Sequence, residues 1–203
     1  MISTDNDKSD VLAEYQTIQI PSNFSLIVRQ PAWFADDVND LYTRLYPDEE
    51  VYGFVGDDVI PQTKNWDAIL IEAAMKHGVS WPNDLITTPG HDKRWGHWFI
   101  KGDLLRAVGY FAPSGVYHFY TDVVWMEIAD RLGIGVYLPD VILEHMHFSN
   151  GKAEHDETYK SHKLHAEEDK KAFEKWQSSP ETEAMIQRIR KQGEIHAESN
   201  RCI

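Results

Sequence analysis

Cysteine is nearly absent from this chain of 203 residues, in which Cys202 is the only one. A single cysteine excludes an intramolecular disulfide and a cysteine-based metal site. Long apolar runs are missing as well, and residues 1–10 are mostly polar and acidic. The sequence therefore predicts neither a membrane span nor a signal peptide, and we expect a cytoplasmic protein.

Positive charge is also scarce. The chain has 20 Lys and Arg against 33 Asp and Glu, which gives a formal net charge of -13. Because nonspecific affinity for nucleic acid comes from clustered basic side chains, we do not expect nucleic acid as a partner. A hydrophobic content of 42% is enough for one sizeable core at this length, and two independent domains would be small.

Three stretches differ in composition. Residues 1–10 offer little to bury, which predicts a disordered tail. Residues 11–150 combine helical and strand patterns and form the expected domain. Residues 151–203 are rich in Lys, Glu, His and Asp, which predicts a C-terminal extension of helices packed on the domain, with a break at 178–180.

Helix and strand patterns alternate within the expected domain. Apolar residues at helical spacing predict helices at 32–46, 66–77, 103–108 and 122–132. Runs with β propensity predict strands at 15–20, 24–28, 51–55, 79–81, 97–100 and 136–147. Asn65 is expected to cap a helix, and Gly78, Gly109 and Gly133 are expected to follow helix ends. This alternation predicts an α/β fold.

The apolar run 51–55 leads into Gly56 and then into two adjacent carboxylates, Asp57 and Asp58. Neighbouring residues of a strand point to opposite faces, so both acids can serve one site only if the chain turns at Gly56. Oxygen ligands of this kind suit Mg²⁺ or Mn²⁺, with substrate phosphates completing the coordination. The pattern fits a metal site, and it equally fits an Asp pair that begins a loop and caps the helix at 66–77.

Two histidines, His145 and His147, stand two positions apart at the end of the last expected strand. This spacing directs both rings to one face of a strand, where they could bind Mn²⁺ or Zn²⁺. Either histidine could equally be a hydrogen-bonded residue at a sheet edge.

Asp122 is expected at the N-terminus of a helix, where the helix dipole favours a carboxylate and a cap is the simplest role. The alternative is a general base. In that case Tyr120, His118 and Trp125 would line a pocket for a small polar ligand.

Basic and aromatic side chains provide further candidates. Arg29 and the loop residues 93–95 could contact phosphate or an acceptor, although charged loop residues are usually only solvated. Four of the seven tryptophans gather in the middle of the chain, namely Trp81, Trp95, Trp98 and Trp125. Sugar rings pack well on indole faces, and core filling explains tryptophan equally well.

The order of these features over residues 24–148 resembles that of the GT-A glycosyltransferases, and residues 156–159 and 173–176 look like a continuation found in some members. The resembling features are an apolar strand that ends in Gly-Asp-Asp-Val-Ile-Pro, a Trp-led helix, a strand followed by Gly-Asp-Leu-Leu, a Tyr-Thr-Asp helix and a final His-x-His strand. The resemblance implies a Rossmann-like mixed sheet flanked by helices.

Residue by residue, the resemblance assigns roles at the expected site. Asp58, with help from Asp57, would bind the ion that bridges the donor pyrophosphate. Asp122 resembles the catalytic base of inverting members, and His145 or His147 the distal metal ligand. The expected donor-binding residues are Arg29, Asp57, Trp98, Gly102 and Asp103.

The implied activity is transfer of a sugar from a nucleotide sugar, in particular a UDP-sugar, to an acceptor glycan or other hydroxyl, with Mn²⁺ or Mg²⁺. Only 56 residues precede Asp57, fewer than in the family, so the base site would be minimal, supplied by a partner chain or a second copy, or lost. Gly56 also replaces the first acid of the Asp-x-Asp motif. The alternatives are a non-catalytic nucleotide- or sugar-binding module and a divalent-metal hydrolase.

Overall fold

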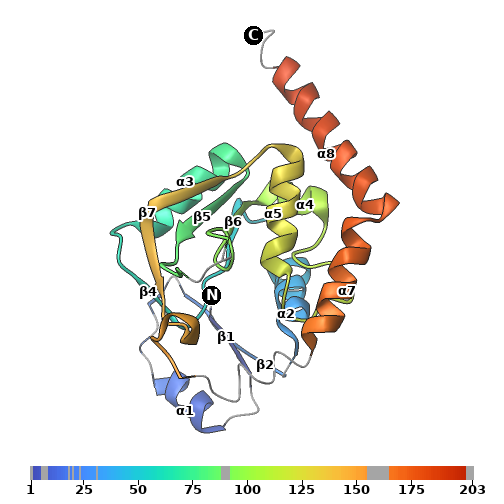
Figure 1. The fold of residues 1–203 in the computed structure, drawn as a ribbon. Coiled ribbons are helices and arrows are strands. Elements are labelled where there is room, and N and C mark those ends of the chain that lie inside the picture. The colour runs from blue at the N-terminus through green and yellow to red at the C-terminus, as the bar shows by residue number, and fades with distance from the viewer. Residues whose placement is uncertain are drawn as a thin grey trace.

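The structure is a computed structural model that describes residues 2–5, 9–17, 19, 21–22, 24–30, 32–87, 92–154 and 165–199. Its centre is a five-stranded sheet with helices on both faces (Figure 1). The strands lie in the order β3 (Val51–Gly53), β6 (Phe99–Lys101), β5 (Val79–Asn83), β7 (Val136–His145) and β4 (Val59–Pro61). β5 and β7 are parallel, and the other neighbouring pairs are antiparallel. The expected α/β class, with a mixed sheet flanked by helices, is confirmed.

The alternation of side chains along the strands builds a core on each face of the sheet. In β6, Phe99 packs with α3 (Trp66–His77), which covers one face. Its neighbour Ile100 packs on the opposite face, which is covered by α4 (Gly102–Val108) and α5 (Thr121–Leu132). The sheet is therefore the middle layer of three.

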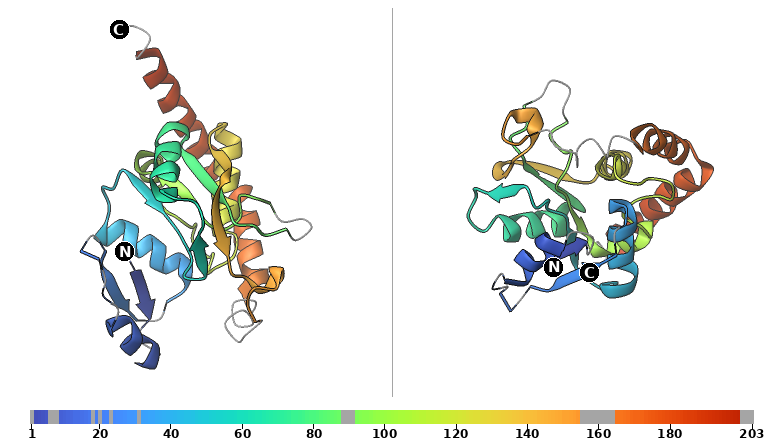
Figure 2. Two further views of the ribbon diagram at one scale, coloured as in Figure 1. Left: turned by 90° about the vertical axis from the view of Figure 1, so that its left-hand side faces the viewer. Right: turned by 90° about the horizontal axis from the view of Figure 1, so that it is seen from below.

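Two C-terminal helices extend the second core. α7 (Ala166–Gln177) and α8 (Pro180–Ser199) contribute buried side chains, among them Trp176, to the cluster that contains Ile100. The helix break expected at 178–180 is confirmed. Figures 1 and 2 show the last turns of α8 extending beyond the rest of the molecule. The C-terminal extension therefore shares the core of the domain instead of forming one of its own.

The N-terminal segment differs from the expectation. β1 (Ile2–Asp5) pairs in parallel with β2 (Leu26–Arg29), and α1 (Ser9–Thr17) lies between them in the chain. Part of the tail expected over 1–10 is thus a strand, because strand pairing uses backbone groups and does not depend on apolar side chains. The strand expected at 15–20 is also wrong, since it begins inside α1.

Helical structure follows the expectation more closely in the next segment. The helix expected at 32–46 is present as α2 (Phe34–Asp40), which continues into the π-helical turn η1 (Leu41–Leu45). A single 3-10 turn, η2 (Phe148–Asn150), follows β7.

None of the helices in the described part of the chain combines the length and the apolar character that a membrane crossing requires.

Glycines end three helices as expected. Gly78, Gly109 and Gly133 follow α3, α4 and α5 with positive φ angles of 99°, 96° and 66°. Asn65 stands at the expected position before α3, but its side chain makes no capping hydrogen bond. Its φ of 57° lies in the left-handed region that asparagine tolerates. The expected N-cap position is therefore confirmed, and Asn65 contributes a turn conformation there instead of a side-chain bond.

Gly102, the first residue of α4, has no room for a side chain. A Cβ at this position would lie 2.0 Å from the backbone oxygen of Glu49. Because that atom belongs to the backbone, it cannot move aside as the end of a side chain can. We expect Gly102→Ala to lower the free energy of unfolding by about 1–3 kcal/mol, as overpacking does, measured by chemical denaturation.

Gly193 in α8 is the matched control, since a Cβ there would meet nothing within 4 Å. Gly193→Ala should leave the free energy of unfolding unchanged or raise it by up to about 1 kcal/mol, because alanine favours helix. A Gly102→Ala variant as stable as Gly193→Ala would contradict the steric argument.

Candidate functional site

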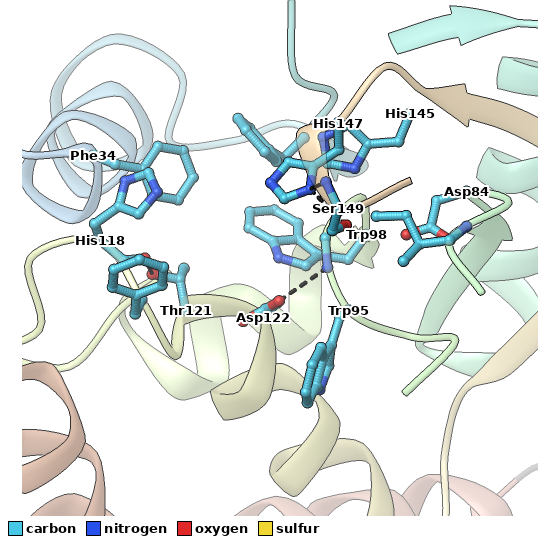
Figure 3. Close-up of a pocket in the computed structure, with 14 residues that line it drawn as sticks. Phe34, Asp84, Trp95, Trp98, His118, Thr121, Asp122, His145, His147 and Ser149 are labelled. Carbon is cyan, nitrogen blue, oxygen red and sulfur yellow. Dashed lines mark hydrogen bonds between the residues drawn. The ribbon is translucent and has the colours of Figure 1, made fainter. Parts of the chain in front are cut away.

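A cavity of about 520 Å³ lies at the carboxyl ends of the parallel strands β5 and β7. Asp84 follows β5 directly, His145 ends β7, and both residues line the cavity. Ligands of open α/β sheets bind at such strand ends. Three more residues singled out in the sequence, Trp98, Asp122 and His147, also line it (Figure 3). The fold thus gathers four of the predicted site residues around one cavity.

Asp58 and His145, two of the predicted metal ligands, are in direct contact. β4 pairs with β7 so that Val59 lies opposite His145, and the backbone N–H of Met146 donates to the carbonyl oxygen of Asp58 at 2.8 Å. This register places the Asp58 side chain beside the end of β7. Nε2 of His145 donates to Oδ2 of Asp58 at 2.9 Å. The alternative role of the Asp pair as a cap of α3 is wrong, because α3 begins without a side-chain capping bond.

The electrostatic surroundings keep Asp58 ionised. Burial raises the pKa of its carboxyl group, but the hydrogen bond and the positive charge of His145, together with His97, outweigh the burial and lower the pKa below its ordinary value. At neutral pH Asp58 is therefore a carboxylate, the form that binds a cation.

Asp57 and Gly56 have different roles from Asp58. Asp57 is exposed in the turn, whereas Asp58 is half-buried; neither is among the residues that line the cavity, and Asp58 reaches it only through its bond to His145. The chain turns at 57–58, directly after Gly56, and Gly56 has no positive φ, so the turn does not require a glycine conformation. A Cβ at position 56 would lie 2.7 Å from Oδ1 of Asp58 and 3.5 Å from Cε1 of His97. Gly56 therefore provides space for the Asp58 carboxylate.

His97, which the sequence indicated only as part of a strand, lies against the Asp58–His145 pair. It is 3% exposed, and its ring centroid is 4.9 Å from that of His145. Its Nδ1 accepts a hydrogen bond from the backbone N–H of Gly56 at 3.4 Å. Burial, together with the charge of His145, lowers the pKa of His97 to about 3, against the opposing effect of Asp58. The one feature of the sequence that could have indicated this role for His97 is its position at the start of an otherwise apolar run.

The low pKa of His97 makes stability depend on pH. An unfolded histidine takes up a proton near pH 6.5, whereas folded His97 stays neutral down to about pH 3. Between these values the unfolded state binds one more proton, so this histidine lowers the free energy of unfolding by roughly 1.4 kcal/mol for each pH unit as the pH falls. His97→Asn, whose amide oxygen can accept from Gly56, should flatten the pH dependence by about one proton in chemical denaturation. An unchanged slope would show that His97 is protonated in the folded state.

His147 lies beyond the end of β7, so the strand argument that paired it with His145 does not apply. Its Nδ1 accepts the backbone N–H of Ser149 at 3.2 Å, which caps η2. The two rings are nevertheless close, with centroids 5.0 Å apart, and both histidines line the cavity. The capped turn, not the strand, brings His147 to the site.

Asp122 lies in the first turn of α5, as expected. Its Oδ1 accepts the backbone N–H of Val123 at 2.8 Å, and its Oδ2 accepts that of Gly96 at 2.9 Å. The second bond fixes the carboxylate against the loop that carries Trp95, so the residue does more than cap its own helix. Of the side chains expected around it, His118 lines the cavity, whereas Trp125 is fully buried in the core.

Three predicted donor-binding residues lie away from this cavity. Arg29 pairs with Asp37 and Asp40 and lines a different cavity of about 460 Å³. Gly102 and Asp103 follow β6, which runs antiparallel to β5. They therefore lie at the end of the sheet opposite to the cavity. None of the three lines this cavity, and their assignment to a donor site stays a prediction.

Arg94 does not line the cavity either, and its guanidinium forms ion pairs with Asp92 and Asp130. These ion pairs connect the loop at 92–95 to α5, and a contact of Arg94 with phosphate stays a prediction. Residues 156–159, which contributed to the resemblance, and Cys202 lie outside the described residues.

The remaining wall of the cavity is largely aromatic, and the part of the chain that the structure describes places no Lys or Arg on it. Its large apolar side chains are Phe34, Phe54, Ile86, Trp95, Trp98 and Phe119. Fixed charge comes from Asp84 and Asp122, with the Asp58 carboxylate beside His145. Asp84 is 4% exposed, and its backbone oxygen accepts the N–H of His145 at 3.1 Å. The sequence analysis did not identify Asp84, because its role depends on the neighbouring strand.

Among the residues that the structure describes, no three or more His, Cys, Asp or Glu side chains are grouped so as to hold a metal ion. The Asp58–His145 pair could provide two protein ligands to an ion, with the other ligands coming from water and substrate. Two neighbouring ligands on an octahedral ion with bonds of about 2.1 Å lie about 3 Å apart. Oδ2 of Asp58 and Nε2 of His145 are 2.9 Å apart. Water and substrate phosphates commonly complete such a coordination sphere.

No protein-family model matches the chain, and comparisons with curated proteins and with solved structures found no match. The indication of function therefore comes from the chemistry of the cavity: an Asp58 carboxylate hydrogen-bonded to His145, a fixed Asp122 carboxylate and a largely aromatic wall.

Proposed function

We propose that the protein is a metal-dependent glycosyltransferase that moves a sugar from a nucleotide sugar, such as a UDP-sugar, to an acceptor hydroxyl with inversion. The observation that carries the proposal is that Asp122 and the Asp58-bonded His145 line the same cavity. Such a transfer needs a base for the acceptor and positive charge for the leaving diphosphate. Asp122 can act as the base, and a cation held by Asp58 and His145 would supply the positive charge. The resemblance to GT-A enzymes in residue order adds to this support.

The charge of the cavity supports dependence on a cation. Asp84 and Asp122 line it, and among the described residues of its wall none is Lys or Arg. A diphosphate would be repelled by this wall unless a cation accompanied it. Mn²⁺ or Mg²⁺ held by Asp58 and His145 would supply that positive charge at the leaving group.

Asp122 is the proposed base. Its two oxygens accept backbone N–H groups at 2.9 Å and 2.8 Å, which fix the carboxylate at the cavity, and an ionised carboxylate is an acceptor that can take up a proton. An acceptor hydroxyl in the cavity transfers its proton to Asp122 while its oxygen forms a bond to the anomeric carbon. The bond from that carbon to the diphosphate oxygen breaks with its electron pair leaving on the diphosphate, and the configuration inverts.

The aromatic wall supports a sugar as the transferred group. Indole and phenyl faces offer flat apolar surfaces against which the C–H faces of a sugar pack. Trp98 is held in place by stacking on Phe111, with ring centroids 5.2 Å apart, and Trp95 is 38% exposed at the cavity. The first provides a rigid floor, and the second can contact a ligand.

Isothermal titration with UDP, with and without Mn²⁺, tests the proposal. We expect binding with Mn²⁺ and none after chelation. A panel of nucleotide sugars and acceptors, analysed by mass spectrometry, then identifies the transferred sugar. Release of free sugar under all acceptor conditions would favour a hydrolase, and failure to bind any nucleoside diphosphate with Mn²⁺ or Mg²⁺ would overturn the proposal.

A further inference from the structure

Asp169, on α7 in the C-terminal extension, is a fully buried carboxylate far from the predicted site in sequence. It accepts three consecutive backbone N–H groups. Oδ1 accepts that of Tyr117 at 2.6 Å, and Oδ2 accepts those of His118 at 3.2 Å and Phe119 at 2.8 Å. Successive N–H groups that converge in this way form a nest for an anion, and here the anion belongs to the protein itself.

The loop that Asp169 binds is fixed on two further sides. The backbone N–H of Ala35, in α2, donates to the carbonyl oxygen of Tyr117 at 3.0 Å. The ring of Tyr120 stacks on that of Phe173, also in α7, with centroids 5.1 Å apart. Tyr120 has a φ of 68°, which a tyrosine adopts only where its surroundings impose it. The loop is therefore held between α2 and α7.

This loop forms one wall of the cavity. His118, Phe119 and Thr121 line it, and Asp122 follows directly. Figure 3 shows His118 and Thr121 on the opposite side of the cavity from His145 and Asp84. We name His118, Phe119 and Thr121 the acceptor wall, because the proposed base stands beside them and the proposed cation site lies across the cavity.

We infer that Asp169 is a positioning residue that holds the acceptor wall and the Asp122 carboxylate in place. The inference rests on the function proposed above and extends it, since it makes the C-terminal extension part of the active unit. A carboxylate is the side chain suited to this role, because it accepts on both oxygens and donates on neither. An asparagine of the same shape would turn an NH₂ group against one or two of the three N–H groups.

Asp169→Asn tests the inference, with Glu174→Gln on the exposed face of α7 as the matched control. Amide exchange, resolved by NMR, reports the contacts directly. We expect the amides of 117–119 to lose protection by at least about tenfold, because each loses a charged acceptor. The Gly96 amide, which donates to Asp122, should lose protection as well if the carboxylate shifts. Amides of β5 and β7 provide the reference for global stability.

Kinetics provides the second measurement. Asp169→Asn should lower kcat by about 10–100-fold and leave the donor KM unchanged, since small displacements of a base have effects of this size. Asp169→Glu, which restores the charge, should recover part of the protection and of kcat. Glu174→Gln should behave as the wild type in both measurements.

The outcomes separate this inference from the proposed function. Loss of protection at 117–119 with Gly96 and kcat unchanged would overturn it and leave Asp169 a purely structural anchor. Unchanged protection at 117–119 would also overturn it. If the protein binds no nucleoside diphosphate, but the amides of 117–119 and of Gly96 both lose protection, then the positioning of Asp122 is upheld. Only the proposed transferase activity is rejected.

Discussion

Asp122→Asn is expected to lower kcat for sugar transfer by about 10²–10⁴-fold, the usual contribution of a general base. The amide keeps the shape of the side chain and one acceptor oxygen for the backbone N–H groups of Gly96 and Val123. It loses the negative charge and the basicity. Because the cation site lies elsewhere on the cavity wall, the affinity for UDP with Mn²⁺ should remain the same. Steady-state kinetics together with titration separates the two effects.

Asp67→Asn is a close control for this variant. Asp67 is the second residue of α3, just as Asp122 is the second residue of α5, and it does not line the cavity. Both substitutions remove one charge from the first turn of a helix, with a similar small loss of helix stabilisation. Unchanged transfer by Asp122→Asn would reduce Asp122 to a helix-capping residue, whatever the donor affinity.

Asp58→Asn should have the second largest effect, a loss of UDP affinity in the presence of Mn²⁺. Even residues that only support a metal ligand reduce metal affinity by about 10–100-fold when they are replaced, so a direct ligand should cost at least that much. The variant retains the side-chain volume beside Gly56 and can still bond to His145. Titration with Mn²⁺ and then with UDP measures the loss.

Asp57→Asn is the matched variant for Asp58, because the two acids are adjacent and only Asp58 contacts His145. We expect Asp57→Asn to change the affinity for UDP less than Asp58→Asn does. An equal or larger loss for Asp57→Asn would assign the cation to the exposed side of the turn. That result would leave the Asp58–His145 bond as a structural contact.

Four of the five strands of the sheet, all except β4, and several candidate site residues could be predicted because their signals are local. An apolar run that ends in acids indicated Asp58, and two histidines two positions apart at the end of a strand indicated His145. Their contact could not be read from either segment, since it depends on the pairing of Val59 with His145. Local patterns therefore identified the candidates, and strand register brought them together.

Gly102 and Asp103 show what local patterns leave out. The turn after β6 was recognised, but the end of the sheet at which this turn lies depends on the direction of β6 relative to β5. That direction is decided by long-range pairing. Asp84, His97 and Asp169 were missed for a related reason, because each acts through contacts with distant segments that no spacing in the sequence records.

The distance in sequence between Asp169 and the loop that it holds has a consequence for synthesis of the chain. Phe119 precedes Asp169 by 50 residues, and every residue that lines the cavity precedes α7. Translation from the N-terminus therefore produces all groups of the cavity before the carboxylate that fixes one of its walls. A nascent chain that stops short of α7 has the proposed base and cation ligands but lacks that anchor, so activity should begin only after α7 has left the ribosome.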